Sequence, residues 1–339
     1  MNSVSMRKLT LALLLLLLAP ACSRRQEARP GEQTSGLFLI RQGGKTGFID
    51  SDGKIAIAPQ FDAASPFSEG LAVIGMANRA GYIDEDGKIV INPQFESGAP
   101  FSDGLAAVRV NGAWGFIDKK GKMVIPPQFQ DPGPLPIGFS EGLAAVFHGP
   151  GTPIGYIDKE GRMAIPARFQ AGLPFHEGLA LVGLGGAYGY IGREGEVAIN
   201  PQFDEASSFY EGLAAVRIGD RWGYIDKSGK YAINPQFAAA RVFSGGLALV
   251  GVQGRAGYID KSGKIAVAPQ FDGADDFRDG MAAVRVGDRW GYIDAKGKLV
   301  INPQFDDARP FSLGLAPVQM GEAWGYIDKE GKFVWSPTL

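Results

Sequence analysis

The sequence predicts an all-β repeat protein with nine copies of one unit of about 34 residues. Three observations support this prediction: a fixed period, glycines that recur at the same places in every unit, and short apolar strands separated by turn residues. The units begin at Leu37, Leu71, Leu105, Leu143, Leu179, Leu213, Leu247, Met281 and Leu315. Such a period is typical of a solenoid, a propeller or an array.

We expect the units to stack into an open β-solenoid-like body, and a closed β-propeller is the alternative. The period is short for a four-stranded propeller blade, which takes roughly 40–45 residues. The last unit also stops at Leu339, without the loop that would lead into another copy. One unit could not fold alone, because the few side chains that it buries cannot offset the entropy lost on ordering it. Neighbouring units must supply the remaining burial.

Each unit is expected to form three short antiparallel strands. The first is apolar, as in 105–110, and a two-residue turn such as Asn111-Gly112 follows it. The second runs from Trp222 to Asp226 in the clearest copy, and the next turn places glycine where positive φ is needed. The third strand is apolar on both faces, so we expect neighbouring units to cover both. It should stop at the Asn-Pro pair, because proline cannot donate to the ladder. A polar loop then leads to the next unit.

The first 35 residues read as a targeting segment rather than as part of the fold. Arg7 and the lysine after it precede an apolar run that ends at Ala19, which predicts a signal peptide over residues 1–21. The run is too short for a good membrane-spanning helix. Cys22, the only cysteine, resembles the acylated cysteine of bacterial lipoproteins, so residues 22–35 are expected to form a lipidated tether. Cleavage that leaves an ordinary free thiol is the alternative.

The motifs resemble those of the WG-repeat family, a group of bacterial β-repeat proteins that also occur as lipoproteins. The shared pattern is Gly-Tyr-Ile-Asp, a turn with Gly-Lys, then Asn-Pro-Gln-Phe and Phe-Ser-Glu-Gly, and it covers residues 37–339. The tryptophan that names the family stands only at Trp114, Trp222, Trp290 and Trp324. The other units hold Thr46, Ala80, Ile154, Tyr188 and Ala256 in that column. The resemblance implies a scaffold and brings no catalytic residues with it.

Composition argues against several classes of function. The chain has 34 Lys and Arg against 36 Asp and Glu, so no basic surface for nucleic acid is expected. His148 and His176 lack the partners of a metal site, and no Ser-His-Asp or Cys-His set can be assembled. The aspartate that recurs after the second strand, as at Asp226, is expected to cap a turn rather than to catalyse. We therefore expect a protein that is not an enzyme and holds no cofactor or metal.

Candidate binding residues were sought among the features that differ between units. One column of arginines stands beside the tryptophan column; arginine beside tryptophan can stack for structure or contact anionic and sugar-like ligands. Two insertions interrupt the period, at 131–138 and 148–153, and extra loops on a regular scaffold often carry function. Neutral drift of the array is the alternative for the insertions. The candidates are Arg109, Arg217, Arg285, Trp114, Trp222, Trp290, Pro134 and His148.

These observations predict a non-catalytic protein that presents a repeated β surface to a protein partner in the cell envelope. A cell-wall glycan is the alternative ligand. The protein is expected to be exported and held by lipid on Cys22 at the outer membrane, because Ser23 rather than aspartate follows the cysteine. A periplasmic or secreted protein is the alternative. An enzyme would need carboxylates gathered at the loops of units three and four.

Overall fold

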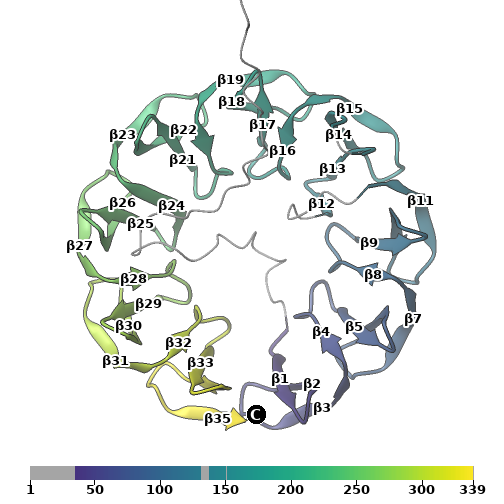
Figure 1. Cartoon of the computed structure of the whole chain (residues 1–339), viewed down its shortest axis with the longest axis horizontal. Helices are drawn as coiled ribbons and strands as arrows, with labels where there is room; N and C mark the ends of the chain where they lie inside the picture. Colours follow the sequence, from purple (N-terminus) through teal and green to yellow (C-terminus); the bar gives the residue numbers. More distant parts are fainter. Residues whose placement is uncertain (1–34, 131–136, 150, 339) are drawn as a thin grey trace, which may run out of the picture.

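The structure is a computed structural model that describes residues 35–130, 137–149 and 151–338. In these residues 35 strands form nine antiparallel sheets, and there is no helix. Figure 1 shows the sheets as nine blades around a common axis, with the last blade beside the first. The chain is therefore a closed nine-bladed β-propeller. The nine repeats are confirmed, whereas the open solenoid that we expected first is wrong.

The strands of a blade follow one another from the axis to the rim (Figure 1). The innermost strands are β4 (Ala63–Ala64), β8 (Ser97–Gly98), β12 (Phe139–Ser140), β16 (Ala171–Gly172), β20 (Glu205–Ala206), β24 (Ala239–Ser244), β28 (Gly273–Ala274) and β32 (Asp307–Ala308). The second strands are β1 (Phe38–Gln42), β5 (Ala72–Met76), β9 (Leu105–Val110), β13 (Leu143–Val146), β17 (Ala180–Leu184), β21 (Leu213–Ile218), β25 (Leu247–Val252), β29 (Met281–Val286) and β33 (Ala316–Met320). The third strands are β2 (Lys45–Ile49), β6 (Arg79–Ile83), β10 (Ala113–Asp118), β14 (Ile154–Ile157), β18 (Ala187–Ile191), β22 (Arg221–Asp226), β26 (Arg255–Asp260), β30 (Arg289–Asp294) and β34 (Ala323–Ile327). The outer strands are β3 (Ile55–Phe61), β7 (Ile89–Phe95), β11 (Met123–Phe129), β15 (Met163–Phe169), β19 (Val197–Phe203), β23 (Tyr231–Phe237), β27 (Ile265–Phe271), β31 (Leu299–Phe305) and β35 (Phe333–Thr338).

A blade holds four strands rather than the three that we expected, and blade one has three in the described residues. The extra strand lies nearest the axis and spans only two residues in most blades. In blade two it pairs through Ala63 with Gly75 and through Ala64 with Ile74, in the segment that the sequence presents as a polar loop. Because this strand is so short, a unit of about 34 residues is long enough for a four-stranded blade.

The outer strand continues past the proline that was expected to end it. In blade six, Trp222 pairs with Phe237 and Tyr224 pairs with Ile233, so three residues of β23 stand opposite Gly223 alone. This bulge brings the outer strand over the glycine: a Cβ on Gly223 would lie 2.5 Å from the carbonyl oxygen of Ile233. Proline is tolerated because the bulge lies on the edge strand of the sheet. The third-strand glycine of the repeat therefore lies directly against the backbone of the outer strand at its proline.

The outer strands are covered on one side only, so the expectation of cover on both faces is wrong. Ile57 is buried, and its side chain lies against Gly87 in a turn of the next blade. Ile55 and Val90, near the starts of their strands, are 49% and 41% exposed. Their strands, β3 and β7, lie at the rim of the ring (Figure 1).

Buried aromatic residues join each blade to the next. Tyr190 of blade five is fully buried, and its ring packs on Phe209 of blade six with 4.9 Å between ring centroids. Its hydroxyl donates a hydrogen bond of 2.7 Å to the carbonyl of Ser207. Burial raises the pKa of Tyr190, so the hydroxyl remains a donor at every physiological pH. Equivalent pairs recur around the ring at Tyr82–Phe101, Tyr156–Phe175, Tyr224–Phe243, Tyr258–Phe277 and Tyr292–Phe311.

A carboxylate also links neighbouring blades at most junctions, and we call this contact the carboxylate clamp. Glu211 of blade six accepts a hydrogen bond from the N–H of Gly246 in blade seven, and Lys261 of blade seven lies 3.2 Å from its carboxylate. The acid–glycine contacts are Glu69–Gly104, Asp103–Gly142, Glu141–Gly178, Glu177–Gly212, Glu211–Gly246 and Asp279–Gly314. Where the acid is replaced by Gly245 or Leu313, the basic position also changes, to Ala295 or Ser51. The two positions therefore vary as a unit.

Blade nine closes the ring against blade one. The ring of Tyr326 lies 5.6 Å from that of Phe38, and its hydroxyl donates a 2.7 Å hydrogen bond to the carbonyl of Leu39. In blade two the equivalent carbonyl, on Val73, accepts the N–H of Ser65 from the inner strand. At the closing junction a tyrosine hydroxyl thus takes the place of an inner-strand N–H. This contact joins residues 287 positions apart, which an open array could not bring together.

We expect Gly223→Ala to lower the free energy of unfolding by about 2 kcal/mol or more, because the added Cβ would collide with the outer strand. Gly138→Ala is the matched control, since a Cβ there would meet nothing within 4 Å. Denaturant unfolding of both variants measures the difference. Equal stabilities would show that the close contact does not constrain the blade.

Candidate functional site

The two faces of the propeller carry different loops. One face carries the two-residue hairpins between second and third strands, such as 77–78 and 111–112, and we call it the hairpin face. The segments that enter the inner strands lie on this face too, since the N–H of Asp62 bonds to the carbonyl of Gly75 beside the hairpin. The opposite face carries the Asp-Gly turns and the carboxylate clamps.

The turn aspartates have the structural role that the sequence predicts. Asp226 accepts hydrogen bonds at Oδ1 from the backbone N–H groups of Ser228 and Lys230, at 2.8 and 3.2 Å. The hydroxyl of Ser228 also donates to this oxygen, and it holds the pKa of Asp226 below its usual value. The carboxylate is thus ionised and committed to its turn.

Each predicted Arg–Trp pair is brought together, but the three pairs are not brought to one site. The cross-strand partners are Arg109 and Trp114, Arg217 and Trp222, and Arg285 and Trp290. They lie in blades three, six and eight. The three indoles are only 7–9% exposed and belong to the apolar clusters between their blades and the next. These tryptophans therefore fill the junctions.

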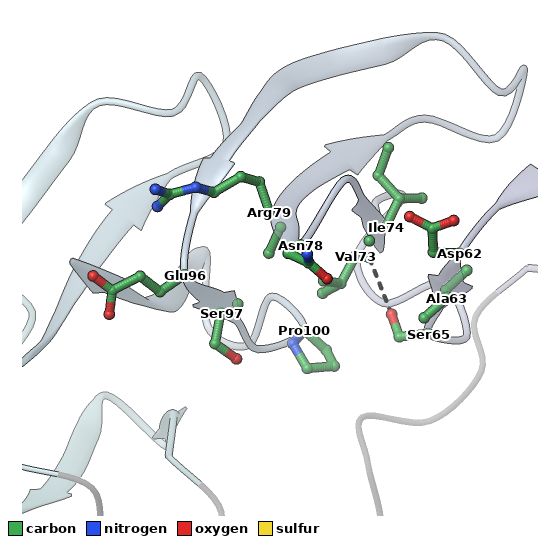
Figure 2. Close-up of a pocket in the computed structure, with 14 residues that line it drawn as sticks. Asp62, Ala63, Ser65, Val73, Ile74, Asn78, Arg79, Glu96, Ser97 and Pro100 are labelled. Carbon is green, nitrogen blue, oxygen red and sulfur yellow. Dashed lines mark hydrogen bonds between the residues drawn. The ribbon is translucent and has the colours of Figure 1, made fainter. Parts of the chain in front are cut away.

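Blade two lacks both members of the pair and has a cavity in their place. Gly75 stands in the arginine column and Ala80 in the tryptophan column, and they are cross-strand partners. Figure 2 shows the resulting pocket of about 590 Å³, which reaches from blade two to Ser97 and Gly98 of blade three. We call it the blade-two pocket. A space that a tryptophan and an arginine occupy in other blades is left open here.

Blade seven lacks the same pair but has a larger residue on its inner strand. Gly251 and Ala256 repeat the small pair there. However, Arg241 occupies the inner-strand position at which blade two has Ser65, and its side chain is only 11% exposed. Its guanidinium lies 3.3 Å from the carboxylate of Asp275 in blade eight, so an ion pair crosses the junction. In blade two, by contrast, the small pair and a small inner-strand residue occur together.

Charged side chains stand beside the pocket without pairing across it. Lys45 binds Asp62 at 2.6 Å at the junction of blades one and two, and ion pairs at the same positions join blades seven to eight and eight to nine. At the pocket, the corresponding residues are Arg79 and Glu96, and the described residues show no ion pair between them. Arg79 instead donates to the carbonyl of Gln94, while Glu96 accepts the N–H of Gly112. Figure 2 shows both side chains at the pocket.

Asp62 adds a second carboxylate to the lining. The Lys45 ammonium donates to it, and together with the N–H of Ala77 this holds the pKa of Asp62 below its usual value. The lining therefore combines small apolar walls with one guanidinium and two carboxylates, and it holds no histidine, cysteine or aromatic ring. The hydroxyl of Ser65 donates to the carbonyl of Pro66 and has no base beside it. This composition suits binding better than covalent chemistry.

The two insertions belong to one blade rather than to two separate units. Blade three ends with β11, at Phe129, and blade four consists of β12 to β15. In the sequence, residues 131–138 and 148–153 therefore both belong to blade four. The N–H of Gln130 bonds to the carbonyl of Phe147, as the N–H of Asp62 bonds to that of Gly75 in blade two, so the residues that precede the two insertions keep the pairing of the repeat. The exposed His148 ring lies 5.5 Å from that of Phe129. Pro134 and Cys22 lie outside the described residues.

The second histidine lies apart from this loop. His176 Nε2 is 3.4 Å from the hydroxyl of Tyr210. No group of three or more His, Cys, Asp or Glu residues in the described ranges is arranged to hold a metal ion. Over the same ranges, no helix is long and apolar enough to cross a membrane.

The sequence-based reading missed the blade-two pocket, although the signal was present. Ala80 was noted as an exception in the tryptophan column, and Gly75 stands in the arginine column. The sequence does not give the register between β5 and β6, and only this register shows that Gly75 and Ala80 face each other. In blade two the loss of both residues at facing positions coincides with a small inner-strand residue, Ser65.

Comparison with known proteins agrees with the repeat and the fold. The model of the WG containing repeat matches residues 47–78, 81–112, 114–149, 154–186, 188–222, 222–255, 257–290 and 290–322. No curated protein was found to match the chain. Among solved structures, a eukaryotic initiation factor is similar with a TM-score of 0.63 and 12% identity over 90% of this chain and 95% of that one. At this identity the likeness concerns the fold alone.

Two further structures resemble the chain more loosely. The dihydro-heme d1 dehydrogenase NirN in complex with DHE has a TM-score of 0.47 and 14% identity, over 95% of this chain and 78% of that one. Apo AztD from Citrobacter koseri has a TM-score of 0.42 and 13% identity, over 89% of this chain and 93% of that one.

We expect the double variant Gly75→Arg with Ala80→Trp to fold, and its free energy of unfolding to hold or rise by up to about 2 kcal/mol. It restores the pair that packs three other blades, and a Cβ on Gly75 would meet that of Ala63 at an ordinary 3.5 Å. Ala256→Trp in blade seven is the control. Ala256 is fully buried beside the Arg241 ion pair, so overpacking should cost about 1–3 kcal/mol. Thermal unfolding compares them, and a destabilised filled pocket would contradict our description of the space.

Proposed function

The chain belongs to the WG-repeat family, and on that premise we propose that it is a non-catalytic binding protein whose hairpin face receives a protein partner at blades two to four. The observation that carries the proposal is the blade-two pocket of about 590 Å³. A cavity of this size lies in the range of natural binding sites. The pocket opens at the junction of blades two and three. In blades three, six and eight, the tryptophan of the Arg–Trp pair is buried against the next blade.

A protein partner suits the surroundings of the pocket. Arg79 and Glu96 offer charges of both signs at its side, which favours a partner segment that carries its own mixed charges. The two insertions of blade four interrupt the repeat in the neighbouring part of the chain, and extra loops on a regular scaffold often carry function. A cell-wall glycan is less well served, because the pocket lining offers no aromatic ring for a sugar to stack on.

We further propose that the protein is exported and anchored in the bacterial envelope, at the outer membrane, through lipid on Cys22. The support is the sequence pattern alone: a basic start, an apolar run and a single cysteine. Several acyl chains on one cysteine would hold the protein stably, whereas one chain binds a membrane only weakly.

Replacing Cys22 with serine should move the protein from the membrane fraction to the soluble fraction, because the acylated thiol is lost. Fractionation followed by immunoblotting measures this. If the variant stays in the membrane fraction, the anchor is not lipid on Cys22. If the native protein is already in the soluble fraction, the protein is periplasmic or secreted instead.

Affinity capture from envelope extract tests the binding function. We expect the native protein to retain a protein partner and the Gly75→Arg, Ala80→Trp variant to lose it, because the pocket is filled. A second variant with 131–138 and 148–153 cut to the length of their neighbours should fold and bind more weakly. Retention of purified peptidoglycan instead of a protein would favour the glycan alternative, and its hydrolysis by the pure protein would overturn the non-catalytic assignment.

A further inference from the structure

The chain itself shows what fits the blade-two pocket. In blade eight the indole of Trp290 lies beside Arg285, and a Cβ on Gly273 would come within 3.4 Å of its ring. The backbone around the pocket has the same register: Gly75 pairs with Ala80 as Arg285 pairs with Trp290. The inner strand also pairs alike, through Ala63 in blade two and Gly273 in blade eight. The blade-two pocket is therefore an indole site without its indole.

The walls of the pocket favour a planar aromatic occupant over other apolar groups. Ala63, Gly75 and Gly98 present small, flat surfaces from two neighbouring blades. Two carboxylates also line the pocket: Asp62 accepts from Lys45 and from the N–H of Ala77, and Glu96 accepts the N–H of Gly112 and lies 3.9 Å from Arg109; their remaining acceptor capacity is open to an indole N–H. An aliphatic side chain could fill the pocket but has no hydrogen-bond donor for the two carboxylates.

We propose that the blade-two pocket binds an exposed tryptophan side chain of the partner protein, which supplies in trans the tryptophan that blade two lacks. This inference rests on the proposed binding function and names the group recognised. The pocket volume of about 590 Å³ also leaves room for the residues that flank the tryptophan. Arg79 and Glu96 would then meet charges on either side of it.

The test uses the full-length protein with N-acetyl-tryptophan amide as the probe and N-acetyl-leucine amide as the control, read by NMR shift changes. We expect the tryptophan probe to bind the native chain at one site, with residues of β5, β6 and β8 shifted, and the leucine probe to bind at least about tenfold more weakly. Gly75→Arg with Ala80→Trp should abolish the tryptophan effect.

A gain-of-site variant strengthens the test. Arg217→Gly with Trp222→Ala copies the blade-two pair into blade six, where Ser207 stands at the position of Ser65, and should add a second site for the tryptophan probe. Arg285→Gly with Trp290→Ala is the matched control in blade eight, where Asp275 stands at that position and pairs with Arg241, so no second site is expected. Equal binding of the two probes, or no tryptophan binding to the native chain, would overturn the inference.

The outcomes separate this inference from the proposed function. If neither probe binds but the filled variant loses its captured partner, the pocket binds the partner through some other group and only the inference fails. If the filled variant retains the partner, the proposed function fails at this site, whatever the probes show.

Discussion

The close contact between the third-strand glycine and the proline-bearing outer strand is the constraint from which the rest of the structure follows. Only glycine lets the bulge of the outer strand cross at this distance, at Gly223 opposite Pro235 and equally at Gly155 opposite Ala167. The bulge changes the register between the strands. The residue after the glycine is a buried aromatic that reaches the next blade, where its ring meets a phenylalanine and its hydroxyl meets a carbonyl. One backbone contact inside a blade thereby positions the aromatic residue that packs against the next blade.

Much of this architecture could be predicted from the sequence, and the part that could not has a physical reason. The period, the hairpin at Asn111 and the capped turn at Asp226 follow from local residue patterns. The inner strand does not, because two residues such as Ala63 and Ala64 carry no periodic signal. Closure depends on a small rotation between neighbouring units, summed nine times, and no single unit encodes it. The sequence shows the arginine and tryptophan columns, but only the register shows which residues of the two columns face each other, and the pocket depends on that.

The positions that differ between blades show how a repeat array can hold a site without disturbing its scaffold. At the carboxylate clamp, the acid and the base are lost together at Gly245 and Ala295, so neither charge is left there without the other. At the Arg–Trp positions, blade two loses both members and keeps the backbone register, whereas blade one keeps only Arg41 and blade nine only Trp324. Each loss is tolerated because the glycine contact and the buried aromatic pair remain, and stability in such arrays is shared over many neighbouring junctions. The same repeat position can thus hold a packing residue in one blade and line a binding pocket in another.

The central claim is that the ring closes, with blade nine meeting blade one as every other blade meets its neighbour. Phe38 and Tyr326 test it most directly, because their rings lie 5.6 Å apart although the residues stand at opposite ends of the repeat array. An isotope-edited NOE measurement on protein labelled at phenylalanine and tyrosine, assigned with Phe38→Leu, reads this contact. A cross-peak between the two rings is predicted. Its absence in a folded protein would mean that the blades form an open array.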